Sequence, residues 1–78
     1  MKIRDNIDYV AFLQTVRSCA GQVFFCTTDG DKLNLKSMLS EYIFITVAMS
    51  SDLIQGGIVN CDIPEDYTRL SEYLREDS

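Results

Sequence analysis

The chain has 78 residues, of which 46% are hydrophobic and 24% charged, and its net charge at neutral pH is −5. This length predicts one domain over residues 1–78 with a thin core, which makes a deep enzyme pocket improbable. The excess of acidic residues argues against nucleic acid, because phosphates attract a basic face. No run approaches the roughly 20 apolar residues that span a bilayer, and residues 1–5 lack the apolar run of a signal peptide. We therefore expect a cytoplasmic protein without membrane insertion.

The first elements expected in chain order are a short edge strand over residues 2–5 and a helix. Asn6 is a good N-cap for this helix, which we expect to run to about Ala20, with Gly21 in the C′ position. Helical spacing places six apolar residues on one stripe, which we interpret as core. They are Tyr9, Phe12, Leu13, Val16, Cys19 and Ala20.

A hairpin is predicted next. Residues 22–28 are rich in β-branched and aromatic side chains, which is typical of a strand. Asp29-Gly30 is a strong turn signal, because glycine accepts positive φ at no steric cost. In residues 32–36, Leu33 and Leu35 alternate with polar side chains, as in a half-buried strand. Ser37 then stands as the N-cap of a second helix.

The segment from Met38 to Met49 is apolar almost throughout. Periodicity alone leaves residues 43–49 open between helix and strand. A strand is expected within residues 53–61, where Gly56-Gly57 indicates a bulge or kink. A last helix is expected from about Asp62, which has capping-box spacing to Glu65. Its apolar stripe would be Ile63, Tyr67, Leu70 and Leu74, and residues 75–78 would be an exposed tail.

The run Lys32-Leu33-Asn34-Leu35-Lys36-Ser37-Met38-Leu39 resembles the region around the regulatory serine of the histidine-containing phosphocarrier protein of bacterial sugar uptake. The resemblance extends over roughly residues 8–75, with the elements in matching order. It implies a helix from Met38 to about Ala48 and a βαββαβα order. The implied fold is an α+β open-faced sandwich, with a mainly antiparallel four-stranded sheet and helices on one face.

The same resemblance implies that the chain is a regulatory, non-catalytic relative of that family. The family transfers phosphate through a histidine in the loop before its first helix, whereas this chain contains no histidine. No catalytic residue is therefore assigned. Ser37 matches the family's regulatory phosphorylation site, although Glu41 one turn later would repel a phosphate there. The alternative is that Ser37 serves only as an N-cap.

No metal or other cofactor is expected. The three cysteines, Cys19, Cys26 and Cys61, show no C-x-x-C spacing and read as reduced thiols that act as small hydrophobes. A structural zinc site takes four ligands, which these residues do not supply without histidine.

The apolar second helix predicts a protein-contact surface. A helix that is apolar nearly all round must be buried nearly all round, and one sheet covers only one of its faces. The partner-binding residues we predict are Met38, Leu39, Tyr42, Ile45 and Met49. Two functions remain open: binding of a protein partner, with a role in sugar phosphotransferase or carbon control, or self-association as a structural module such as a homodimer. An enzyme with a cysteine or carboxylate site is a weaker third possibility.

Overall fold

The computed structural model describes residues 1–49 and 56–76. In this part of the chain, three helices and five short strands form a small α+β fold. Their order is β1 (Lys2–Ile3), α1 (Tyr9–Arg17), β2 (Val23–Cys26), β3 (Lys32–Asn34), α2 (Met38–Met49), β4 (Ile58–Cys61), α4 (Glu65–Arg69) and β5 (Leu74–Arg75).

The strands form two small antiparallel sheets, so the predicted single four-stranded sheet is wrong. One sheet has the order β3-β2-β4, and the other pairs β1 with β5. The difference lies at Leu74, which we expected on the last helix and which instead pairs with Ile3. Met1 does exchange backbone hydrogen bonds with Val59 of β4, at 3.2 and 2.7 Å. The ladder to β4 does not continue along β1, which forms its register with β5.

The predicted hairpin is confirmed, with strands shorter than expected. β2 and β3 pair antiparallel with Phe25 opposite Leu33, and Gly30 in the turn adopts a φ of 93°. The helical interpretation of Met38 to Met49 is also confirmed by α2. Residues 43–49 are therefore helical, as the spacing of the phosphocarrier family implied.

Two predicted helix boundaries are wrong. Helix α1 begins after Asp8, whose side chain accepts a hydrogen bond from the Ala11 N–H at 3.1 Å, whereas Asn6 lies outside the helix with a φ of 60°. The helix ends at Arg17 and is capped by Ser18, so Gly21 is not at its C′ position. A short carboxylate one residue before Tyr9 reaches the free N–H groups of the first turn more directly than Asn6.

The C-terminal region differs most from its prediction. Helix α4 spans five residues and begins after Pro64, so Asp62 does not form the predicted capping box. Leu70 and Leu74 are buried, but Leu74 reaches the core from a strand. Gly56 and Gly57 precede β4 and do not interrupt it, and residues 53–55 of the predicted strand lie outside the described residues.

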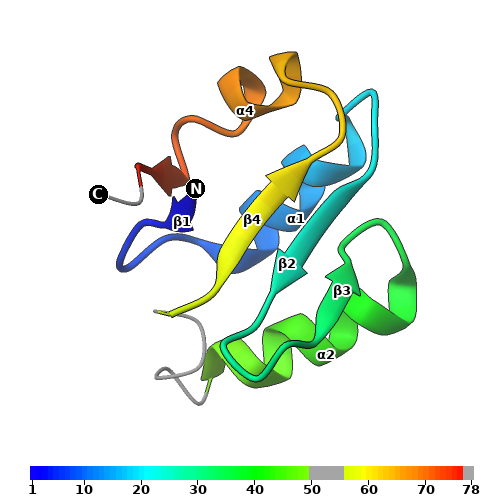
Figure 1. Cartoon of the computed structure of the whole chain (residues 1–78), viewed down its shortest axis with the longest axis vertical. Helices are drawn as coiled ribbons and strands as arrows, with labels where there is room; N and C mark the ends of the chain where they lie inside the picture. Colours follow the sequence, from blue (N-terminus) through cyan, green and yellow to red (C-terminus); the bar gives the residue numbers. More distant parts are fainter. Residues whose placement is uncertain (50–55, 77–78) are drawn as a thin grey trace.

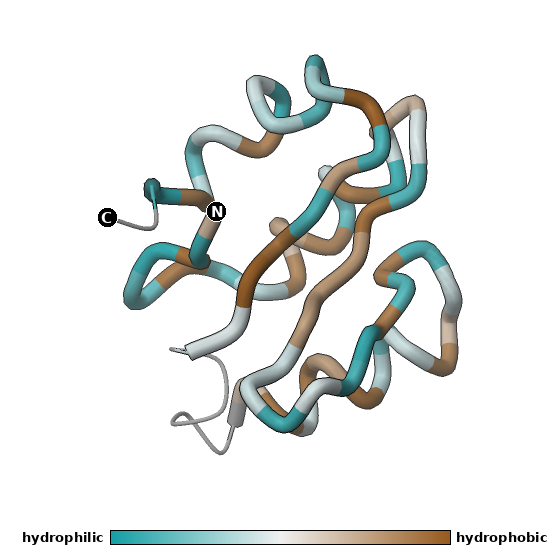
Figure 2. The backbone as a smooth tube through the Cα atoms, in the orientation of Figure 1, coloured by the Kyte–Doolittle hydropathy of each residue, from teal (hydrophilic) through white to brown (hydrophobic). Residues whose placement is uncertain are grey.

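The core lies between the β3-β2-β4 sheet and the two longer helices. In β2, Val23 and Phe25 are buried on the helix side, while Phe24 and Cys26 alternate to the other face. The hydrophobic stretches of β2 and β4 run side by side, and α1 lies behind them (Figures 1 and 2). Phe44 of α2 joins these layers, because its ring lies 5.2 Å from that of Phe25 and 5.7 Å from that of Phe12. None of the helices described is long and apolar enough to cross a membrane.

Candidate functional site

The outward face of α2 is apolar and exposed. Phe44 is fully buried and holds the opposite side of the helix on the sheet, with Val47 and Ala48 packed partly against the core. Because the sheet and α1 cover only this side, the first turns of α2 present apolar side chains to solvent. The exposed fractions are 80% for Met38, 70% for Leu39, 73% for Tyr42 and 39% for Ile43.

Val10 extends this surface onto α1, because it is a large apolar residue that is 57% exposed. We call these five residues, Val10, Met38, Leu39, Tyr42 and Ile43, the α1–α2 patch. Soluble proteins expose single apolar residues routinely, but an exposed cluster is typical of an interaction surface. The patch contains three of the five predicted partner-binding residues.

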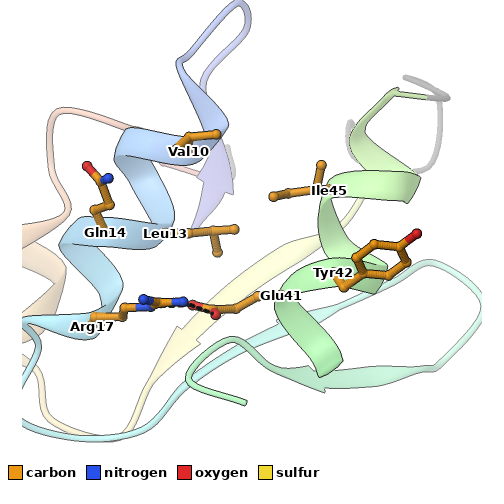
Figure 3. A pocket seen from close by; sticks show the side chains of 7 residues that line it. All are labelled: Val10, Leu13, Gln14, Arg17, Glu41, Tyr42 and Ile45. Carbon is orange, nitrogen blue, oxygen red and sulfur yellow. Dashed lines mark hydrogen bonds and ion pairs between the residues drawn. The ribbon is translucent and has the colours of Figure 1, made fainter. Parts of the chain in front are cut away.

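A shallow groove runs between α1 and α2 and connects the two parts of the patch. Its volume is about 190 Å³. Figure 3 shows Val10 and Leu13 on one wall facing Ile45 on the other, with Tyr42 beyond. Ile45 is partly buried and contributes to this groove rather than to the fully exposed surface. Met49 ends α2, and its side chain lies outside the described part of the structure.

An ion pair closes one end of the groove. Arg17 donates from Nη2 to Glu41 Oε1 at 2.7 Å and from Nε to Glu41 Oε2 at 3.1 Å (Figure 3). The Glu41 side chain is 7% exposed and that of Arg17 is 63% exposed. The hydrogen bond and the negative charge of Glu41 raise the pKa of Arg17. The groove therefore contains a compensated pair of charges and is otherwise uncharged.

Ser37 lies immediately before α2 and is exposed. Its carbonyl oxygen accepts the Glu41 N–H at 2.9 Å, so Ser37 stands at the N-cap position that the sequence predicted. The expected repulsion between Glu41 and a phosphate at Ser37 is weakened, because both carboxylate oxygens of Glu41 bind Arg17. Phosphorylation of Ser37 stays a prediction.

Asp66 is a buried carboxylate that the sequence analysis did not single out. It is 2% exposed and accepts hydrogen bonds from the N–H groups of Gly21 at 2.9 Å and Ala20 at 3.1 Å. These bonds lower the pKa of Asp66, against the opposing effect of its burial. The carboxylate thereby ties α4 to the segment that follows α1, which is a structural role.

The three cysteines are free thiols, of which Cys19 is buried and Cys26 and Cys61 are partly buried. Burial raises the pKa of the Cys61 thiol to about 11 and also raises that of Cys19. A thiol with a raised pKa is a poor nucleophile near neutral pH, because the thiolate is the reactive form. Among residues 1–49 and 56–76 no group of three or more Cys, Asp or Glu side chains is placed to hold a metal ion.

Comparisons of this chain with models of known protein families, with characterised proteins and with solved structures find no significant match. The resemblance to the phosphocarrier family around Ser37 stays a prediction from the sequence.

Proposed function

We propose that this protein acts by binding protein through the α1–α2 patch and has no catalytic role. The observation that supports this proposal is the exposure of Met38, Leu39 and Tyr42 on the first two turns of one helix, each at 70% or more. Burying an apolar side chain of this size is worth about 1.5–3 kcal/mol. Methionine and tyrosine also suit interfaces, since one adapts its shape and the other combines an apolar ring with a hydroxyl.

The dimensions of the groove favour a protein partner over a small molecule. Small-molecule pockets usually enclose about 300–1,000 Å³, whereas the groove between α1 and α2 holds about 190 Å³. The ion pair at its end has both carboxylate oxygens of Glu41 occupied by Arg17. The groove is suited to receive apolar side chains from a larger surface, which would cover the exposed residues beside it.

A role in sugar phosphotransferase or carbon control remains part of this proposal through the resemblance around Ser37. Met38 and Leu39 match contact positions of the phosphocarrier family, and both are exposed here. The chain contains no histidine, so it would contribute contacts and would not carry phosphate by the family's route. In this proposal Ser37 is a regulatory position beside the patch.

A photo-crosslinking experiment in the native host tests the proposal. Benzoylphenylalanine replaces Tyr42 in the centre of the patch, and in a matched control it replaces Thr68, which is exposed on α4. Figure 1 shows α4 at the opposite end of the molecule from α2. We expect light-dependent protein adducts from position 42 alone, with this chain or another protein identified by mass spectrometry. Equal labelling from both positions, or none from position 42, would contradict the proposal.

A further inference from the structure

We infer that the protein bound by the α1–α2 patch is a second copy of this chain, in a symmetric dimer through α2. This inference rests on the proposed function, because it names the partner of the same surface. Three properties of the patch support it: its charge, the arrangement of its side chains along α2 and its area.

The charge of the patch permits two copies to meet. The chain carries a net charge of −5, so two copies repel each other over most of their surfaces. The five residues of the patch are uncharged, and the groove beside them contains only the compensated Arg17–Glu41 pair. A basic partner would be expected to meet acidic groups in such a surface, since complementary charge directs association. A neutral surface on an acidic chain instead suits a second copy of that chain, because the two copies can meet there without bringing like charges together.

The arrangement of the side chains fits a two-fold axis. Residues four apart in a helix form one row, and the exposed side chains of α2 lie in two such rows: Met38 with Tyr42, and Leu39 with Ile43. Rows of this kind interlock with the same rows of a second helix at a crossing angle of about −50°. Tyr42 is central, because exposed Thr46 continues its row by one further turn. In an isologous dimer the central residue lies nearest the axis, so we place Tyr42 opposite the partner's Tyr42.

The area of the patch is sufficient for a dimer of modest affinity. Its residues are between 39% and 80% exposed. An aromatic side chain such as that of Tyr42 buries on the order of 150–250 Å², and the smaller aliphatic side chains bury less. The patch therefore offers roughly 500–600 Å² per copy, and two copies bury on the order of 1,000–1,200 Å², at the lower end for a specific interface. We expect a dimer with a Kd in the micromolar range, which dissociates on dilution.

Sedimentation velocity of the full chain over a concentration series tests this inference. We expect the mass of one chain at low micromolar concentration and that of two chains near millimolar concentration. Tyr42→Glu should weaken the dimer by about 30-fold or more, because it places two like charges beside the axis. Thr68→Glu adds the same charge on α4 and should leave the Kd unchanged. Circular dichroism establishes that both variants remain folded.

Disulfide trapping gives a second, positive test. A Tyr42→Cys variant should form a covalent dimer under mild oxidation, because the two side chains face each other across the axis. A Thr68→Cys variant carries the same native cysteines and should remain monomeric at the same concentration. A single-chain mass up to about 1 mM, or a dimer that is insensitive to Tyr42→Glu, would overturn the inference. Crosslinks from position 42 to a different protein, with a monomeric purified chain, would overturn the dimer and leave the proposed function standing.

Discussion

Arg17 and Glu41 bind each other through two hydrogen bonds, of 2.7 and 3.1 Å, and so join the last residue of α1 to the first turn of α2. The two partners differ in their surroundings, since the Glu41 side chain is 7% exposed and that of Arg17 is 63% exposed. Loss of the arginine therefore leaves a buried carboxylate without a partner, whereas loss of the carboxylate leaves a guanidinium that water can solvate.

This asymmetry predicts unequal effects of the two single substitutions. Arg17→Met should destabilise the protein, because a buried acceptor that is left unsatisfied costs about 1–3 kcal/mol, and Glu41→Leu should cost less. The double variant Arg17→Met/Glu41→Leu should recover most of the loss. Urea unfolding of the four proteins measures these differences. Equal losses for both single variants, or additive losses in the double variant, would mean that the pair does not link the helices energetically.

The cap of α2 gives a second prediction. Ser37→Ala should destabilise the protein by roughly 0.5–2 kcal/mol if the hydroxyl satisfies a free N–H of the first turn. Ser37→Asp should be neutral or slightly stabilising, because a carboxylate interacts favourably with the positive end of the helix. Denaturant melts measure both, with Ser71→Ala, exposed outside this helix, as the control. Identical stabilities for the three Ser37 forms would show that the side chain does not cap α2.

Much of the local structure could be predicted from residues close together in the chain. The Asp29-Gly30 turn needs only one residue that accepts positive φ between two strand-forming runs, and Gly30 has that conformation. The exposure of Met38, Leu39 and Tyr42 was also predictable. A helix that is apolar on all sides has more apolar surface than one sheet can cover, so part of that surface stays exposed. These features depend on spacing and propensity alone.

The features that were missed depend on residues far apart in sequence. The Leu74–Arg75 strand looked like the end of a helical stripe, because leucine four residues after Leu70 fits helical spacing. Its pairing with Ile3 depends on where the chain returns after a helix of five residues. The partner of Glu41 was likewise not predictable, since Arg17 lies 24 residues earlier and on a different helix. Their opposite charges predict an ion pair only when α1 and α2 are known to be neighbours.

The close approach of Gly57 to Phe25 predicts a strict requirement for glycine. A Cβ atom at Gly57 would lie 2.1 Å from Cζ of Phe25, whose ring is fully buried and in contact with Phe44. Gly57→Ala should therefore destabilise the protein by about 1–3 kcal/mol, as overpacking of a core does. Thermal unfolding measures the loss.

Gly56→Ala is the matched control for this substitution. A Cβ atom at Gly56 would meet Cγ2 of Thr28 at 2.4 Å, but Thr28 is exposed and its side chain is free to rotate away. The two alanine variants should therefore differ clearly, with Gly57→Ala the less stable. Equal unfolding temperatures for the two variants would indicate that the Phe25 ring does not lie against Gly57.

The buried carboxylate of Asp66 predicts a specific dependence of stability on pH. Hydrogen bonds from the N–H groups of Gly21 and Ala20 lower its pKa in the folded protein below the ordinary value of 3.8. The folded state therefore holds fewer protons on this group than the unfolded state does. The stability contributed by the carboxylate is complete above the ordinary pKa and is lost as the pH falls below 3.8 through the lowered folded-state pKa.

Asp66→Asn isolates this contribution, because an amide has nearly the same shape and does not titrate. At neutral pH the variant should be less stable than the native chain. Both carboxylate oxygens of Asp66 accept a backbone N–H, whereas asparagine replaces one of these oxygens with an amide nitrogen, which cannot accept. As the pH is lowered below 3.8, the native chain should lose stability faster, and the difference between the two should narrow. Urea unfolding at a series of pH values measures the difference, with Asp62→Asn, exposed beside β4, as the control. A difference that stays constant down to pH 2.5 would show that the bonds to Ala20 and Gly21 do not depend on the charge of Asp66.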